Sequence, residues 1–199
     1  PGPVLIDLPK DVADTKIDFK YPEKVTLRGY KPNIIGHPLQ ISRAAEMINQ
    51  CQRPVICAGG GINTSRAEQE LMKLAEKGSI PVVTTLMGTG SFPTDHPLYM
   101  GMMGMHGLSS ANKTITEADL IIAAGARFAD RTIGKVEGFA PEAKIIHIDI
   151  DPAEIGKNIH AHTPIVGDVK QILEEIGKNV KDKKPSKWNE YIAGLKEKF

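Results

Sequence analysis

The chain has 199 residues, of which 25 are Lys or Arg and 24 are Asp or Glu. This length allows one α/β domain with a complete core, and the net charge of +1 gives no reason to expect nucleic acid or an anionic membrane as a partner. The sequence contains no apolar run of membrane-spanning length and no signal-like start, so a cytoplasmic location is expected.

The first 39 residues are predicted to lie outside the core domain. Residues 4–8 have the composition of a β-strand, and no partner strand is apparent nearby. We therefore expect residues 1–11 to be the tail of a preceding domain. Residues 12–39 combine three prolines with many charges and little periodicity, which indicates an extended linker. The chain begins with Pro1 instead of Met, so it looks like a piece of a longer protein.

The core domain is predicted to begin at residue 40. Apolar residues recur at helical spacing over residues 41–51, and a β-branched strand follows at residues 55–58. Three glycines at 59–61 then end the strand, where the missing side chains would let phosphate or sugar approach the main chain. A tight strand-to-helix turn without a ligand explains the glycines equally well. The motif G-x-G-x-x-G fails at Thr64, which weakens a nicotinamide reading.

The rest of the chain alternates between strand and helix patterns. Further strands are predicted at residues 82–85, 120–124, 144–150 and 164–166, and further helices at residues 65–78, 109–118, 169–176 and 188–199. Residues 86–107 are predicted to be a loop, whose methionine-rich part is too long for a plain connection. Residues 181–186 are predicted to be a charged hinge that leads, with the last helix, to a missing domain. Alternation of this kind implies parallel strands with helices on both faces.

Two cysteines, Cys51 and Cys57, are too few for a cysteine-rich zinc site. Both lie in apolar segments, so buried free thiols in a reducing compartment are expected. The sequence shows no catalytic triad, metal-binding motif or ligand-spaced carboxylate cluster, so we assign no catalytic and no metal-binding residue.

Candidate binding groups follow five of the predicted strands, and ligands of open parallel sheets bind at the carboxyl ends of the strands. Arg127 and Arg131 can donate to phosphate oxygens, while Asp149 and Asp168 can accept hydrogen bonds from ribose hydroxyls or an adenine amino group. These groups outline a site for an extended dinucleotide. Alternatives remain for each: an ion-pair loop for the arginines, a helix N-cap for Asp168, and adaptable packing for the methionines.

Six motifs, in this order and spacing, resemble the central domain of the acetohydroxyacid synthase (acetolactate synthase) large subunit, a thiamine-diphosphate enzyme. The resemblance covers about residues 1–178 and is carried by Gly59-Gly60-Gly61, Leu86-Met87-Gly88, Gly104-Met105-His106-Gly107, Gly125 to Arg131, His147 to Pro152 and Val166-Gly167-Asp168. It implies a three-layer α/β fold with a six-stranded parallel sheet of the FAD/NAD-binding (DHS-like, Rossmann-like) type, and an FAD bound in extended form.

The resemblance also implies which residues contact FAD. Carried over by motif, they are Arg28, Gly59, Gly60, Gly61, Thr85, Leu86, Met105, His106, Gly107, Gly125, Arg127, Arg131, Asp149, Ile150, Gly167 and Asp168. Without the resemblance, Arg28 would be assigned to the linker. The chain departs from the family at Ala129, where an acidic residue is common, and this removes one polar contact to FAD that the family would otherwise predict.

In the family, pyruvate is decarboxylated on thiamine diphosphate with Mg²⁺, and the product condenses with a second 2-oxo acid in branched-chain amino-acid synthesis. The groups that bind thiamine diphosphate lie in amino- and carboxyl-terminal domains that this sequence lacks, so the chain alone is expected to be inactive. The implied partners are those domains, a homodimer or tetramer of the full enzyme and a regulatory small subunit. The alternative is a stand-alone flavin-binding or electron-transfer module. A sirtuin-type deacylase would need a zinc module that two cysteines cannot build.

Overall fold

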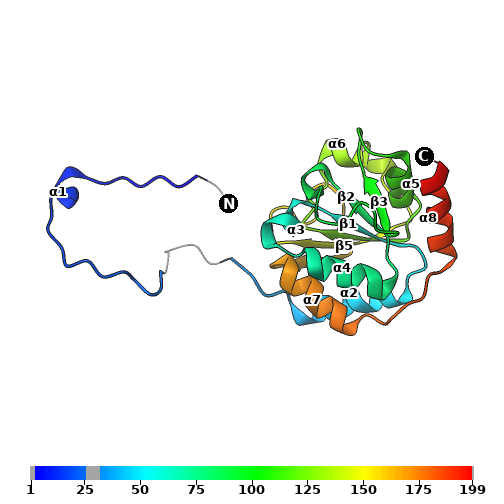
Figure 1. Cartoon of the computed structure of the whole chain (residues 1–199), viewed down its shortest axis with the longest axis horizontal. Coiled ribbons are helices and arrows are strands. Elements are labelled where there is room, and N and C mark those ends of the chain that lie inside the picture. The colour runs from blue at the N-terminus through cyan, green and yellow to red at the C-terminus, as the bar shows by residue number, and fades with distance from the viewer. Residues whose placement is uncertain (1–2, 26–31, 199) are drawn as a thin grey trace. The chain divides into compact units, whose positions relative to one another are not determined.

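The computed structural model describes residues 3–25 and 32–198, with Glu137 described by its backbone alone, and the chain divides into two units, residues 1–31 and 32–199 (Figure 1). In the first unit, residues 3–25 contain one helical turn, α1 (Lys10–Ala13), and no strand. The strand expected at residues 4–8 is therefore wrong. A strand needs a neighbour for its backbone groups, and the described part of this unit supplies none.

The second unit is an α/β domain built on a six-stranded parallel sheet with the order β3-β2-β1-β4-β5-β6 (Figure 1). The strands are β1 (Pro54–Ala58), β2 (Val82–Thr84), β3 (Tyr99–Met102), β4 (Leu120–Ala124), β5 (Lys144–Asp149) and β6 (Thr163–Val166). The helices are α2 (Pro38–Gln50), α3 (Gly60–Ser65), α4 (Glu68–Gly78), α5 (Ser109–Thr116), α6 (Asp130–Ile133), α7 (Val169–Asn179) and α8 (Lys187–Lys198), with 3-10 turns η1 (Leu86–Gly88) and η2 (Val136–Gly138). The predicted three-layer fold with six parallel strands is confirmed.

Alternation along the central strands divides the core into two layers. In β1, Ile56 and Ala58 face the layer covered by α2, α4 and α7, whereas Val55 and Cys57 face the layer covered by α5 and α8. Both faces of β1 and β4 are fully covered, which explains their uninterrupted apolar sequences.

Two local elements differ from the expectation. β3 lies within the predicted loop, and its pairing with β2 is interrupted by a register shift beside Gly101, which has a φ of +99°. The helix expected at residues 65–78 begins as α3 at Gly60 and is broken at Arg66, whose φ of 53° ends α3 before α4 starts. The glycines at 60 and 61 are therefore helical, although neither favours a helix intrinsically.

Other expectations hold. Both thiols are free, Cys57 is buried and Cys51 is half-buried. Burial raises the pKa of Cys51 to about 11 and that of Cys57 to about 12, so both stay protonated. Asp168 caps α7, because its side chain accepts hydrogen bonds from the backbone N–H groups of Lys170 and Gln171.

The segment 181–186 and α8 are bound closely to this domain. Lys183 donates from Nζ to the backbone oxygen of Ile48 at 2.6 Å, and its own backbone oxygen accepts from the Ser79 hydroxyl at 2.6 Å. Trp188 donates from Nε1 to the backbone oxygen of Pro54 at 3.0 Å and packs in the core beside α5. In the part of the chain that the structure describes, no helix has the length and apolar character needed to cross a membrane.

Candidate functional site

The strand order places a topological switch point between β1 and β4. The chain runs from β1 outward through β2 to β3, then returns beside β1 as β4 and continues outward through β5 to β6. Loops that leave two neighbouring strands in opposite directions open a crevice, where ligands of doubly wound sheets bind. Gly59 follows β1 and Gly125 follows β4, so two of the predicted binding loops meet at this point.

These two loops approach each other too closely for side chains. A Cβ atom on Gly59 would lie 2.0 Å from the Gly125 oxygen, and one on Gly61 would lie 2.7 Å from the Gly125 Cα. The backbone N–H of Gly61 donates to that same oxygen at 3.1 Å. Contact within the protein therefore accounts for Gly59 and Gly61. Gly60 differs, since the atoms nearest to its Cβ would all belong to Met87, with the Met87 Cβ at 3.0 Å and the Met87 backbone oxygen at 3.5 Å.

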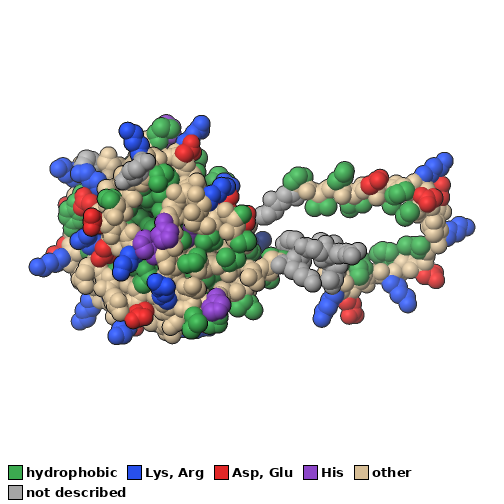
Figure 2. Space-filling model, turned by 180° about the vertical axis from the view of Figure 1, so that it is seen from behind, with side chains coloured by type: hydrophobic (Ala, Val, Ile, Leu, Met, Phe, Trp, Pro, Cys, Tyr) green, Lys and Arg blue, Asp and Glu red, His purple; other side chains and the backbone are tan. Residues whose placement is uncertain are grey.

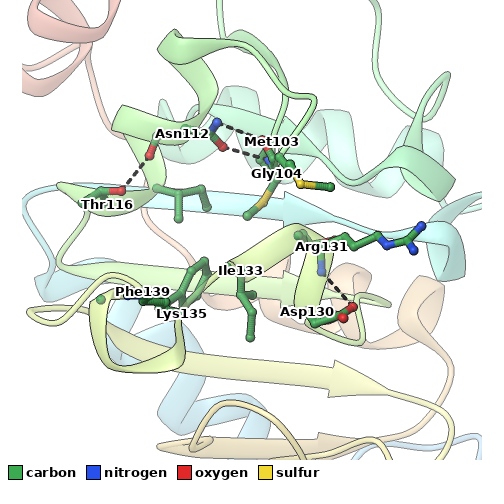
Figure 3. Close-up of a pocket in the computed structure, with 14 residues that line it drawn as sticks. Met103, Gly104, Asn112, Thr116, Asp130, Arg131, Ile133, Lys135 and Phe139 are labelled. Atoms are coloured by element: carbon green, nitrogen blue, oxygen red, sulfur yellow. Dashed lines mark hydrogen bonds between the residues drawn. The ribbon is translucent and has the colours of Figure 1, made fainter.

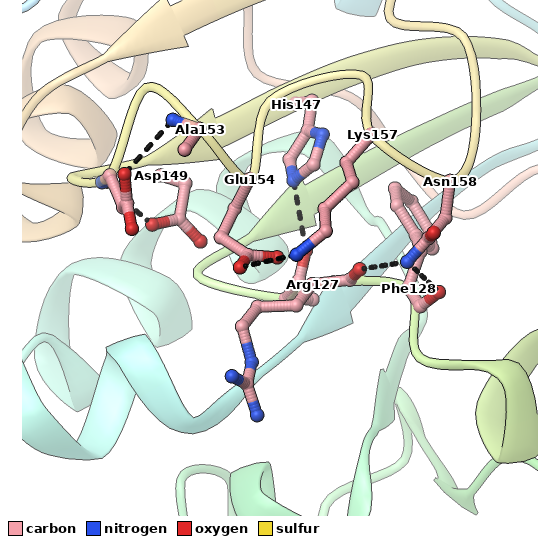
Figure 4. A network of polar contacts seen from close by, with 10 residues as sticks. Arg127, Phe128, His147, Asp149, Ala153, Glu154, Lys157 and Asn158 are labelled. Atoms are coloured by element: carbon pink, nitrogen blue, oxygen red, sulfur yellow. Dashed lines mark hydrogen bonds and ion pairs between the residues drawn. The ribbon is translucent and has the colours of Figure 1, made fainter.

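The loop after β4 presents Arg127 outward. Phe128 has a φ of 51° and is buried against the rings of Phe139 and His147, with centroids 5.6 and 5.2 Å away. Asn158 donates from Nδ2 to the backbone oxygens of Arg127 at 3.3 Å and Phe128 at 3.0 Å. This anchoring leaves the Arg127 side chain exposed, and Figure 4 shows it running away from the surrounding polar network.

His147 fastens the loops after β4 and β5 together. Its Nε2 lies 2.9 Å from the backbone oxygen of Ala126, and its Nδ1 accepts from the N–H of Gly156 at 3.3 Å (Figure 4). The ring therefore carries its proton on Nε2 and donates it to Ala126. Burial lowers the pKa of His147, which keeps the imidazole neutral. Sequence analysis placed His147 in a motif but gave it no role.

The two predicted acidic acceptors each have one oxygen free of hydrogen bonds from described residues. Asp149 accepts the N–H of Asp151 at Oδ1, at 2.9 Å. Asp168 likewise uses only Oδ1 to cap α7, at 3.0 and 3.3 Å. Both side chains are half-buried, and both stand at the ends of adjacent strands. Ile150, which follows Asp149, is exposed.

The loop of residues 103–107, which we call the methionine loop, is held by Asn112 of α5. The Asn112 side chain accepts the N–H of Gly104 at 2.8 Å and donates to the oxygen of Gly104 at 3.0 Å, while the N–H of Met105 donates to the oxygen of Arg131 at 3.0 Å. Beside this loop lies an open pocket of about 640 Å³, bounded by α5, α6 and η2 (Figure 3). The Met105 side chain is 67% exposed, and His106 is exposed as well.

In the sequence, the short turn η1 lies between the glycines and the methionine loop. Thr85 caps it by accepting the N–H of Gly88 at 3.2 Å, and Leu86 and Met87 are 71% and 70% exposed. Asn63 of α3 donates to the backbone oxygen of Met87 at 3.0 Å and so ties η1 to the glycine turn. Leu86 and Met87 thus present exposed apolar side chains beside the glycine turn.

The carboxyl edge thus gathers all of the predicted site residues that the structure describes. Arg28 lies outside the described residues. The ion-pair alternative for the loop after β4 is not supported, because Arg127 and Arg131 form no ion pair with a described residue and Asp130 instead accepts the backbone N–H of Arg131. The described residues contain no group of three or more His, Cys, Asp or Glu side chains that could hold a metal ion.

Comparison with known proteins identifies the fold family. Residues 41–176 match the model of the thiamine pyrophosphate enzyme central domain. The chain belongs to this family. As a thiamine pyrophosphate enzyme central domain, it has the α/β sheet that the sequence resemblance implied, and that resemblance is confirmed.

The central domain is similar to acetolactate synthase large subunits. It is 58% identical over 99% of its length to the probable large subunit of Methanocaldococcus jannaschii and 50% identical over 99% to that of Methanococcus aeolicus. It is 48% identical over its whole length to the acetolactate synthase large subunit of Corynebacterium glutamicum. The chain covers 34%, 35% and 33% of these relatives, about a third of each.

Proposed function

We propose that this chain is the cofactor-binding central domain of an acetolactate synthase large subunit, and that its carboxyl edge holds FAD in extended form. The proposal rests on the row of groups along that edge, centred on the switch point. It contains two exposed arginines that form no ion pair with a described residue and two half-buried carboxylates that each keep one oxygen free of hydrogen bonds from described residues. Six strands spaced by about 4.8 Å give an edge of about 24 Å, long enough for two nucleotide halves joined by a pyrophosphate.

The chemistry of the row fits FAD. Arg127 and Arg131 form no ion pair with a described residue, and their guanidinium groups are donors suited to pyrophosphate oxygens. The Oδ2 atoms of Asp149 and Asp168, which accept no hydrogen bond from a described residue, suit the hydroxyls and amino group of a nucleoside. The exposed side chains of Leu86, Met87 and Met105 suit a flat ring system. Bound FAD would supply a rigid ring and pyrophosphate that link these loops, with no net redox change in the family reaction.

The proposed reaction of the whole enzyme is the condensation of pyruvate with a second 2-oxo acid on thiamine diphosphate and Mg²⁺. That cofactor pair would be held by further domains, with the full enzyme a homodimer or tetramer that can carry a regulatory small subunit. The two free thiols fit a reducing compartment such as the cytoplasm. In this proposal the chain alone positions FAD and scaffolds the neighbouring domains, and it does not turn over.

Titration of FAD fluorescence with the purified chain tests the binding. We expect saturable binding, weakened at least about tenfold by Arg127→Gln, since a charge-assisted hydrogen bond is worth about 1.5–3 kcal/mol. Lys73→Gln is the matched control, because it removes one positive charge from an exposed position on α4. Equal affinity of the Arg127 variant and the control, or no binding at all, would count against FAD at this edge.

Two activity measurements separate the proposal from its alternatives. Pyruvate consumption should stay at background with added thiamine diphosphate, Mg²⁺ and FAD, and measurable turnover would overturn the proposed inactivity of the chain. If bound flavin is reduced and reoxidised by protein partners, the stand-alone electron-transfer module becomes the better reading.

A further inference from the structure

A cluster of basic side chains lies at the opposite, amino edge of the sheet, away from the candidate cofactor site. Lys144 is the first residue of β5, and His162 directly precedes β6. His160 lies on the same connection, and Arg43 projects from α2, the helix that packs on β6. We call these four residues the basic cluster. All four are exposed.

The two histidine rings touch. Their centroids are 5.0 Å apart and the rings meet edge to face at 71°. Figure 2 shows a face of the molecule on which two histidine side chains adjoin each other, with basic side chains close to them. The Nδ1 atom of His162 accepts the backbone N–H of Ile145 at 3.1 Å, so the neutral ring carries its proton on Nε2.

The charges that act on His162 are all positive. Partial burial lowers the pKa of His162, and the charges of His160, Lys144 and Arg43 lower it further. The described groups that shift this pKa include no acidic residue. Among the described residues, neither Lys144 nor Arg43 forms an ion pair. The cluster therefore concentrates positive potential that the domain itself leaves unbalanced.

We propose that the basic cluster binds a phosphate-type oxyanion. Imidazole Nε2–H, ammonium and guanidinium groups are all donors to such an anion, and they come from three separate elements of the fold. A metal ion is a poor alternative, because the hydrogen bond from Ile145 holds the Nδ1 lone pair of His162 and leaves a proton on Nε2.

This site is distinct from the proposed FAD site. Lys144 and Asp149 are the first and last residues of β5, and the five steps of strand between them span about 16 Å. An anion held by the cluster would stabilise the charged form of His162, so binding should raise the pKa of His162 and should strengthen as the pH falls.

Histidine ring signals in NMR spectra of the whole chain, followed against pH, test the proposal. In inorganic phosphate we expect the pKa of His162 to rise by roughly 0.5 unit or more relative to sodium chloride of equal ionic strength, because an adjacent opposite charge favours the charged ring. His96, which lies beside Glu76 on another part of the domain, should not change. An equal response to chloride or acetate, or an equal shift of His96, would overturn the proposal.

Substitutions at exposed positions sharpen the test without endangering the fold. Lys144→Gln and Arg43→Gln should each reduce the phosphate-induced shift of His162 by at least half, whereas Lys73→Gln should leave it unchanged. A shift that survives both cluster substitutions would overturn the proposal. Glycerol phosphate separates the sources of the anion: a larger shift than with inorganic phosphate assigns the site to phosphate esters, and a smaller one assigns it to the free anion.

Discussion

At the scale of single residues, the structure changes the meaning of the glycines after β1. In the sequence they suggest a close approach of a ligand, but two of the three already lie against another loop of the protein. Gly59 and Gly61 make room for the backbone of Gly125, whose own φ of +60° also favours glycine. Their first role is to let the loops on either side of the switch point touch, and this contact shapes the crevice between them.

Gly59→Ala should therefore destabilise the domain whether or not a cofactor is present. Its Cβ would lie 2.0 Å from a backbone oxygen, so the strand end must shift, and we expect the free energy of unfolding to fall by about 2 kcal/mol or more. Urea denaturation measures the change. Gly194→Ala in α8 is the control, because nothing lies within 4 Å of its Cβ position and alanine favours a helix. Equal stability of both variants would refute the packing argument.

The lowered pKa of His147 should make the stability of the domain depend on pH. Its folded pKa lies below the ordinary value of 6.5, so the unfolded chain binds more protons between these two values and stability falls as the pH drops from about 7 through the folded pKa. His147→Gln removes this term along with about 2 kcal/mol of hydrogen bonding and ring contact. The stability difference between wild type and variant should thus shrink from pH 7.5 to pH 5.

Comparing these two proteins by urea unfolding at both pH values cancels the contributions of other groups, His162 included. A difference that stays constant or grows toward pH 5 would show that His147 does not remain neutral in the fold.

At the scale of elements, side chains from one loop or helix hold the backbone of another. The Asn63 side chain donates a hydrogen bond to a backbone oxygen of η1, 24 residues away in sequence. The Asn158 side chain donates one to a backbone oxygen of the loop after β4, 30 residues away. Asn112 clamps both backbone groups of Gly104. None of these asparagines is a proposed ligand contact, yet each fixes a loop that carries one.

Asn112→Ala should loosen the methionine loop and leave the sheet intact. Two hydrogen bonds of the Gly104 backbone are lost, and we expect a cost of about 1–3 kcal/mol because those groups are half-buried. Hydrogen exchange should accelerate at residues 103–107 but not in β1 or β4. Ser109→Ala, at an exposed position on the same helix whose side chain forms no hydrogen bond with a described residue, should change neither quantity, and a uniform acceleration across the domain would contradict a local clamp.

The sequence predicts those parts of the fold and of the candidate site that depend on contacts between residues close together in the chain. The helices α2 and α7 and the strands β1 and β4 follow from apolar periodicity, and the row of binding residues follows from the rule that parallel strands end at one edge. β3 was missed because Gly101 and its methionine neighbours lack strand propensity, and pairing with β2 decides its conformation. The asparagine contacts were missed because a polar residue in sequence does not reveal a partner 24 or 30 residues away.

At the scale of the whole molecule, the carboxyl-terminal helix is part of the domain's core. Trp188 is 6% exposed and bonds to the start of β1, and Ile192 packs into the same layer. The segment before α8 is held by Lys183 and Ser79. The other end of α8 is held at the segment before β3, because Lys196 donates from Nζ to the backbone oxygen of His96 at 3.3 Å.

Trp188 is the only tryptophan, so its fluorescence reports on this attachment. We expect unfolding followed by tryptophan fluorescence and by far-ultraviolet circular dichroism to share one midpoint, because α8 and the sheet lose their packing together. Lys183→Met, which removes the bond to Ile48, should lower both midpoints equally. An earlier fluorescence transition would show that α8 detaches on its own.

The contact between the two glycine turns also limits how this protein can change over time. A side chain added at residue 59 or 61 occupies space that the turn at residue 125 needs, and the reverse holds for a side chain at 125. Neither turn can therefore be altered alone without displacing the other, although Gly61 and Gly125 lie 64 positions apart in the sequence. Altering the ligand of this crevice, by natural variation or by design, would have to proceed through the surrounding side chains, since the backbone at its centre admits almost no substitution.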